Sequence, residues 1–309
     1  MGHPLLAGNG AHGVTGMANR PAAARRLGRR RFLTAAVAAV AAGSLPGGAG
    51  ARPLDEVMEA GRLRVAVYRD NPPFSFREAG RLTGIDVDLA RIIAERLGVG
   101  IDCMELTAGE TVFDDLRNAV WKGHYLGGGV ADIMMHVPYE REFGLRNPEA
   151  VLFAPYQRER FALARNPMRV TQPLLAALPD EPVAVEVDSI PDFFLLGAFG
   201  GRLRERIVHH ATVAEAVAAL VAGEVAAVVA TQSQIEGALG GRAADFPVSP
   251  VSFPGMMMAS AWDIGLAVKE NSRDLAYAVG DLVAAMVEDG TVEAVFRRYG
   301  VTRHAVAAD

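Results

Sequence analysis

The sequence predicts an α/β fold with a sizeable core. Half of the 309 residues are hydrophobic, which is enough apolar material for one or two domains. Short apolar runs of strand length alternate with longer segments in which apolar residues recur at helical spacing. Strands bounded by helices in this way predict parallel sheets that are covered on both faces.

The expected strands share a continuous or alternating apolar pattern and cover Leu63–Val67, Ile101–Leu106, Val130–Val137, Arg160–Ala164, Val183–Val187, Ala226–Ala230 and Ile264–Val268. The expected helices have apolar positions three or four residues apart and cover Ile85–Leu97, Phe113–Trp121, Pro191–Leu196, Thr212–Ala222, Gln232–Leu239, Ser272–Asp289 and Val292–Tyr299. Helix-end signals support several of these bounds. Thr212 and Glu215 make a capping-box pattern, and Gly98, Gly223 and Gly290 stand where helices should end.

The first 51 residues differ in composition from the rest of the chain. They contain six Arg and no Asp or Glu, and an Ala/Val-rich run over Phe32–Ala42 is followed by small residues up to Ala51. This order is typical of a secretory signal, and Arg29–Leu33 matches the twin-arginine export pattern. The apolar run is too short and Ala-rich for a spanning helix. We therefore expect residues 1–51 to be a signal that sends the protein to the periplasm; the alternative is a basic tail without this role.

Charge limits the classes of partner. Without the six Arg of residues 1–51, 25 basic residues remain against 36 acidic ones, so the net charge of the exported chain is near −11. That balance disfavours nucleic acid and anionic membrane surfaces as partners. Cys103 is the only cysteine, so the chain cannot form an internal disulfide.

Motifs at both ends of the expected core carry a family resemblance. Pro72–Phe74 comes before Gly84–Ala90, which reads GIDVDLA. Some 170 residues later, Ile264–Lys269 precedes a long helix that ends at Asp289–Thr291, and Phe296–Gly300 follows. These motifs, in this order, resemble the bacterial extracellular solute-binding proteins of family 3, a group similar to polar-amino-acid receptors.

The resemblance implies a two-lobed periplasmic-binding-protein type II fold. Such a fold has two mixed or parallel sheets flanked by helices, with a hinge made by two chain crossings. Lobe 1 would comprise residues 56–160 and 261–303, and lobe 2 residues 161–260. The lobes of such receptors close over a ligand held between them, which requires no catalytic residue and no cofactor.

The loop after the first strand supplies the first candidate ligand contacts. Tyr68 ends the strand, and Asp70 follows it as a polar neighbour. Ligands in α/β folds sit at the carboxyl ends of strands, so both are expected to face the ligand. Phe74 is expected to be the stacking ring that faces the cleft. The alternating Phe76 is then expected to be a core ring.

A second group of contacts is implied by the resemblance. In the family, an Arg in a Thr-x-x-Arg segment grips the ligand carboxylate through its planar fork. The matching segment here is Pro138–Arg141, in which Pro replaces the Thr and the spacing to the preceding strand is shorter. Arg141 and Tyr139 are expected to face the cleft. The alternative for Arg141 is a surface residue paired with Glu140 or Glu142.

Two further positions concern the charge of the ligand. Relatives carry an Asp where this chain has Thr231, so a ligand α-ammonium would lack that counter-charge. Ser189 keeps a hydroxyl at a helix start that contacts the ligand in relatives, although a plain N-cap is an equal alternative and Asp188 adds negative charge. The resemblance thus implies a small polar or anionic ligand rather than an ordinary α-amino acid.

The stretch between Trp121 and Tyr139 is the most individual part of the sequence. It contains a glycine-rich insertion, His124–Gly129, and then His136 at the end of an expected strand. His136 is expected at the level of the ligand. His124 and His136 are also the candidates for a metal site, although a partly buried His without metal is the commoner case.

The function implied is capture of a small molecule in the periplasm for an ABC-type importer, by a monomer without enzyme activity. One alternative is a receptor-like accessory protein that docks to a periplasmic quinoprotein dehydrogenase, with which the His124–Gly129 insertion is compatible. Another alternative is a cyclohexadienyl-dehydratase-like enzyme on the same fold, with Glu186 or Glu140 as general acid.

Overall fold

The computed structural model describes residues 51–178, 180–256 and 259–307. The export pattern at Arg29–Leu33 and nearly all of the expected signal lie outside these residues. Within the described ranges, no helix is both long and apolar enough to cross a membrane.

The strands are β1 (Arg62–Tyr68), β2 (Phe76–Glu78), β3 (Arg81–Thr83), β4 (Gly100–Leu106), β5 (Ile133–Pro138), β6 (Ala150–Arg165), β7 (Val183–Glu186), β8 (Ile207–His210), β9 (Ala227–Thr231), β10 (Val248–Pro250) and β11 (Ala261–Lys269). The α-helices are α1 (Leu54–Ala60), α2 (Ile85–Leu97), α3 (Val112–Leu116), α4 (Arg141–Leu145), α5 (Ile190–Gly201), α6 (Val213–Ala222), α7 (Gln232–Leu239), α8 (Arg273–Glu288) and α9 (Thr291–Arg298).

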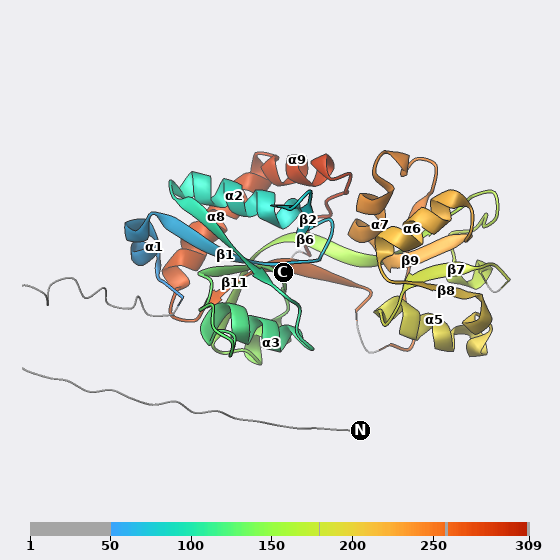
Figure 1. Ribbon diagram of the computed structural model, residues 1–309, viewed down its shortest axis with the longest axis horizontal. Helices are drawn as coiled ribbons and strands as arrows, with labels where there is room; N and C mark the ends of the chain where they lie inside the picture. Colours follow the sequence, from blue (N-terminus) through green and yellow to red (C-terminus); the bar gives the residue numbers. More distant parts are fainter. Residues whose placement is uncertain (1–50, 179, 257–258, 308–309) are drawn as a thin grey trace, which may run out of the picture. The chain divides into compact units, whose positions relative to one another are not determined.

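The described strands form one mixed sheet of nine strands and a separate β2–β3 hairpin (Figure 1). The order in the main sheet is β4-β1-β5-β11-β6-β9-β7-β8, and β10 pairs with β6 beside this path. Strand β1 runs parallel to β4 and β5, and β7 runs parallel to β8 and β9. Strands β6 and β11 run antiparallel to their neighbours, so the α/β class is confirmed with a mixed sheet.

The expectation of two separate sheets is wrong, and strand β6 is the reason. The sequence predicted a short strand at Arg160–Ala164, but β6 spans Ala150–Arg165. Its first part pairs with β11, from Ala150 to Arg160, and its last part pairs with β9, from Phe161 to Arg165. One long strand therefore takes part in both ladders and joins the two halves into one hydrogen-bonded sheet.

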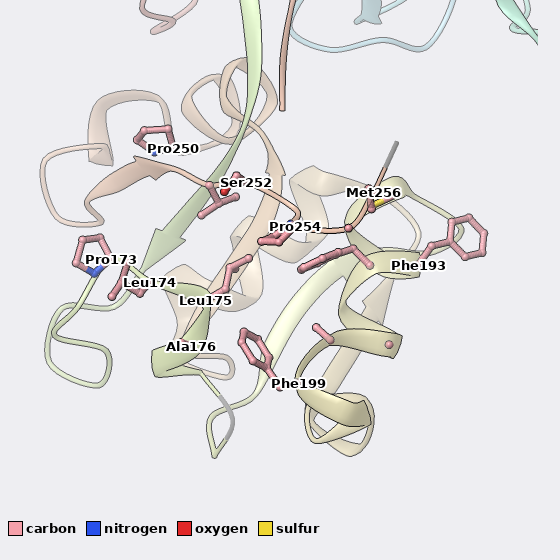
Figure 2. A pocket seen from close by; sticks show the side chains of 15 residues that line it. Pro173, Leu174, Leu175, Ala176, Phe193, Phe199, Pro250, Ser252, Pro254 and Met256 are labelled. Carbon is pink, nitrogen blue, oxygen red and sulfur yellow. The ribbon is translucent and has the colours of Figure 1, made fainter. Parts of the chain in front are cut away.

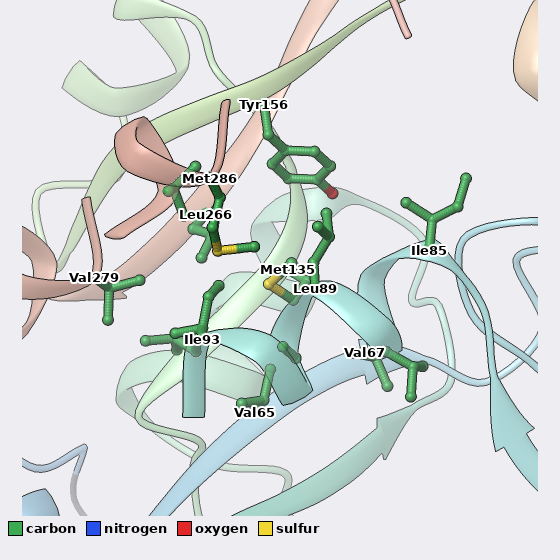
Figure 3. Close-up of a cluster of buried hydrophobic side chains, with 14 of the residues drawn as sticks. Val65, Val67, Ile85, Leu89, Ile93, Met135, Tyr156, Leu266, Val279 and Met286 are labelled. Atoms are coloured by element: carbon green, nitrogen blue, oxygen red, sulfur yellow. The ribbon is translucent and has the colours of Figure 1, made fainter. Parts of the chain in front are cut away.

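Side chains of β1 point alternately to the two faces of the sheet and pack in a different hydrophobic cluster on each face. Val65 and Val67 point into a cluster shared with α2, α8 and α9, whereas Ala66 points to the opposite face, against Leu116 of α3. Figure 3 shows the first cluster, in which Ile93 and the other α2 side chains lie with Met286 of α8. The strand is buried on both faces, as its continuous apolar run predicted.

The strands β7 and β9 are covered in the same way by other helices. Val183 and Val229 pack in a cluster with Leu195 of α5, while Ala184 and Val228 pack on the other face with α6 and α7. Thr212 caps α6 as predicted by accepting a hydrogen bond from the Glu215 amide, but the Glu215 carboxylate accepts from the Ala211 amide rather than from that of Thr212, so the capping box is only half formed. Gly98 and Gly223 end their helices in the left-handed conformation, as expected.

Three local differences have physical causes. Strand β5 begins at Ile133 rather than Val130, because the Asp132 carboxylate turns to accept hydrogen bonds from the Arg52 side chain and the Arg64 amide. The helix expected over Phe113–Trp121 is α3 followed by a π-helical turn, Arg117–Trp121. Strand β8, Ile207–His210, was missed because it is short and only its first two residues are apolar.

Candidate ligand-binding site

Three cavities share wall residues and form the candidate site; we call them the linked cavities. The first has a volume of about 420 Å³ and lies at the end of β1. The second, of about 570 Å³, shares Asp70 with the first. The third, of about 190 Å³, shares Glu186, Val213 and Gln234 with the second. Elements from both halves of the sheet thus line one connected group of cavities.

The end of β1 places two predicted residues at these cavities. Tyr68 and Asp70 both line the first cavity. The Tyr68 hydroxyl donates to Asp115 Oδ2 at 2.8 Å, and burial together with this carboxylate raises the pKa of Tyr68. Tyr68 therefore offers its ring rather than a free hydroxyl. Asp70 is exposed and extends to the second cavity.

The structure reverses the expected roles of Phe74 and Phe76. Phe74 is 2% exposed and packs in the core, with its ring centroid 6.2 Å from that of Phe296. Phe76 instead lines the second cavity. The cause is a tight turn in which the Phe74 amide donates to Asn71 O, while Phe74 O accepts from the Asp86 amide. These bonds fold the turn onto the start of α2 and direct Phe74 inward.

His136 lines the first cavity and is held from behind by a buried acid. Its Nδ1 lies 3.2 Å from Asp86 Oδ2, and Asp86 is fully buried. The Tyr156 hydroxyl donates to the other Asp86 oxygen at 2.6 Å. The ring also packs edge-on against Phe74, at 4.3 Å between centroids. His136 has a positive φ of 61°, an uncommon backbone conformation for this residue type.

Ser189 and Thr231 meet at the third cavity, from two different helix starts. Ser189 caps α5 by accepting a hydrogen bond from the Asp192 amide, so the N-cap role is present beside the cavity position. Thr231 ends β9 and its hydroxyl donates to Gln234 Oε1 at 2.8 Å. Trp262 of β11 also lines this cavity and packs against Phe161.

Arg141 and Tyr139 are not brought to the linked cavities. Arg141 is exposed at the first position of α4, and neither residue is among those that line the linked cavities. Their contact with a ligand stays a prediction. The chain reaches Pro138 at the end of β5 and the Tyr139 amide pairs with Asp263 O, which places α4 beyond the cavities.

The two histidines proposed for metal binding have different surroundings. His124 is exposed, stacks on Tyr125 and accepts a hydrogen bond from the Leu126 amide. His136 pairs with Asp86 instead. Across the part of the chain that the structure describes, no three His, Cys, Asp or Glu side chains gather as a metal-ligating group.

Several site residues did not follow from sequence reasoning. Gln234, Trp262 and Tyr299 line the cavities, and Glu159 is a buried carboxylate on β6, only 2% exposed. Glu159 accepts hydrogen bonds from the Arg160 and Ser233 amides, and burial raises its pKa. The charged run Arg158–Arg160 inside β6 was the available signal, since a charged residue inside an apolar strand needs partners.

A separate apolar groove of about 720 Å³ lies beside α5. It is lined by Leu175, Phe199 and Met256 among other apolar residues, and Figure 2 shows these side chains around one hollow. Phe193 lies at this groove and is 60% exposed. No charged side chain is found among the described residues that line it.

The sequence comparisons find a family match within the first part of the core. Residues 63–125 match the model of the bacterial extracellular solute-binding proteins, family 3. A cyclohexadienyl dehydratase from Pseudomonas aeruginosa is 52% identical over 46 residues, which are 15% of this chain. This match spans only 17% of the length of that relative.

The structural comparisons cover most of the chain. An ancestral cationic amino acid solute-binding protein is similar with a TM-score of 0.60 at 24% identity, over 80% of this chain and 99% of its own. An amino acid ABC transporter substrate-binding protein from Streptococcus pneumoniae, bound to L-arginine, gives 0.55 at 20% identity, over 81% and 99%. A solute receptor for L-cysteine from Neisseria gonorrhoeae gives 0.52 at 19% identity, over 80% and 93%.

The fold of the described chain is therefore the α/β fold of type II periplasmic binding proteins, and its residues 63–125 match the family 3 solute-binding proteins.

Proposed function

We propose that this protein is an exported solute-binding protein that captures a small polar solute in the linked cavities and delivers it to an ABC-type importer. The observation that carries the proposal is the linked cavities themselves, which receive polar residues from β1, β5, β7 and β9. The family match at residues 63–125 and the fold support it.

The proposal includes two lobes that close over the solute. The crossing strands β6 and β11 support a hinge, because they connect the half of the sheet around β1 to the half around β7. Periplasmic location and twin-arginine export rest on Arg29–Leu33. The expected partners are the solute and a membrane permease, and the protein is expected to act as a monomer.

The function includes no catalytic step. The competing candidate is an enzyme of the dehydratase type, favoured by the local match to the Pseudomonas aeruginosa dehydratase and by the imidazole of His136 held against Asp86 beside a cavity. A dehydration assay with a cyclohexadienyl carboxylic acid separates the two functions. Turnover that is lost in His136→Ala would favour the enzyme.

Docking to a periplasmic quinoprotein dehydrogenase is the third candidate, favoured by the exposed apolar groove beside α5. A pull-down with the purified dehydrogenase tests it, and saturable capture that Phe193→Ser removes would support it.

Calorimetric titration with a broad panel of solutes tests the proposal. A bound solute also raises the melting temperature, since it stabilises only the folded state. Ala238→Trp should abolish binding, because Ala238 is exposed at the wall of the second cavity and the indole would fill it. Ala222→Trp, at the exposed end of α6 and away from the cavities, is the matched control. If no solute of any charge class binds, the proposal is wrong.

A further inference from the structure

Two carboxylates from distant parts of the chain line the second cavity without a partner. Asp70 comes from the loop after β1, and Glu186 ends β7. Among the described residues, neither side chain makes a hydrogen bond or an ion pair, although nearby acids such as Glu105 and Asp192 do. Like charges in one cavity repel each other, and a bound cation would relieve that repulsion.

Aromatic rings form part of the same walls. Phe76 and Tyr299 line the second cavity, and Trp262 lines the third, which shares Glu186. The Tyr299 hydroxyl is already engaged with Asp88, so its ring is what it offers to a ligand. Carboxylates combined with the faces of aromatic rings are the usual surroundings of an organic ammonium or guanidinium group.

The guanidinium group that lines the second cavity is already engaged within the protein. Arg77 lines the second cavity, but its Nε donates to Glu105 Oε2 at 2.9 Å and its Nη2 pairs with the other oxygen. Arg69 lines the first cavity but not the second, and its Nε lies 4.0 Å from the same Glu105, beyond hydrogen-bond distance. Arg141 lies outside the cavities altogether.

The start of α5, another place at which an anion could bind, is occupied by a side chain of the protein itself. Asp192 Oδ2 accepts from the Asp188 amide at 3.0 Å, and the Asp192 amide donates to Ser189 Oγ. The second Asp192 oxygen pairs with His209 Nε2 at 2.9 Å. An internal carboxylate thus occupies the position at which a helix N-terminus would bind a ligand carboxylate.

We infer that the solute is an organic cation without a carboxylate group, such as an amine, a guanidine or a quaternary ammonium compound, held in the second cavity between Asp70 and Glu186. This inference rests on the proposed solute-binding function. It differs from recognition of an α-amino acid, because the guanidinium group that lines the second cavity, Arg77, is engaged with Glu105 and not available to an amino-acid carboxylate. Burial raises the pKa of Glu186, as expected for a carboxylate that lacks a counter-charge until a cation arrives.

Matched pairs of compounds test the class of the solute directly. Agmatine and L-arginine differ by one carboxylate, as do putrescine and L-ornithine, and glycine betaine carries a carboxylate where choline has a hydroxymethyl group. Calorimetric titration of the exported full chain should show at least one pair in which the compound without carboxylate binds about tenfold tighter or more. The inference is overturned if the carboxylate-bearing members bind as well or better, or if the best solute is anionic or neutral.

Variants connect the binding to the two carboxylates. Glu186→Gln and Asp70→Asn should each weaken the preferred cation by about tenfold or more, because the charge goes while the shape stays. Glu224→Gln and Asp281→Asn, both at exposed positions outside the cavities, should bind like the unmodified protein. Unchanged affinity in both cavity variants contradicts the inference. Absence of binding by every solute in the panel overturns the proposed function as well.

Discussion

The apolar groove beside α5 and the linked cavities are both large hollows, yet they are built in opposite ways. The groove has the greater volume, about 720 Å³, and apolar walls. The linked cavities are individually smaller but contain Asp70, His136 and Glu186. A polar solute is recognised by a few placed charges rather than by volume, so the smaller cavities are the better candidate for the solute site.

The largest expected difference between the two regions is in how much a substitution there lowers the stability of the protein. Phe296 is fully buried behind the linked cavities, against Phe74 and Tyr156. Phe296→Ala should lower the free energy of unfolding by about 3–5 kcal/mol, because it leaves a void in a packed core. Phe193→Ala, in the groove, should change it by less than about 1 kcal/mol, since the ring is already 60% exposed. Denaturant unfolding measures both, and an equal loss would mean that the groove is closed in solution.

A smaller loss is expected at the acid behind His136. Tyr156→Phe removes the hydroxyl that donates to Asp86, so a buried carboxylate oxygen loses its donor. The free energy of unfolding should fall by about 1–3 kcal/mol. Tyr277→Phe is the control, because Tyr277 is 70% exposed on α8. Equal stability of the two variants would show that the Tyr156 hydroxyl has no such role.

The smallest expected effect is a pH dependence of stability and of cation affinity. It should arise in the linked cavities, which contain Glu186, and not in the groove, whose described lining has no charged side chain. The raised pKa of Glu186 means that the folded protein keeps this proton at pH values where the unfolded chain has released it. The Glu186 contribution to stability therefore falls as pH rises from the ordinary carboxyl value to the raised pKa. Cation affinity should rise over the same window, by up to about tenfold, because the ionised form binds. Arg77 and Asp70 line the same cavity as Glu186.

Titration calorimetry across pH checks this expectation with two variants. Glu186→Gln should remove the rise in affinity, whereas Phe193→Ser in the groove should leave it intact. A rise that persists in Glu186→Gln would assign it to another group, with His136 and Asp70 as the next to test.

Most of the fold could be predicted from local patterns, and the site only in part. Tyr68, Asp70, His136, Ser189 and Thr231 lie at ends of predicted strands or starts of predicted helices, and the structure places all of them on the cavities. Local sequence is enough here, because β1 runs parallel to β5, and β7 to β9, so the carboxyl ends of each pair lie at the same edge of the sheet.

The failures come from contacts between distant parts of the chain. The roles of Phe74 and Phe76 depend on the bond between Phe74 O and the Asp86 amide, which alternation along the sequence does not contain. The continuity of the sheet depends on the pairing of one strand, β6, with both β11 and β9. Glu186 gains its place in the site only where β7 approaches the loop after β1.

The position of Trp262 gives the protein an optical signal of its own. The chain has two tryptophans, and Trp262 lines the third cavity while Trp121 lies in the π-helical turn with its indole nitrogen buried. Replacing Trp121 by Phe would leave a single emitter beside Glu186. Its fluorescence should then change as solute fills the neighbouring cavities, so occupancy can be followed in real time without attaching a dye.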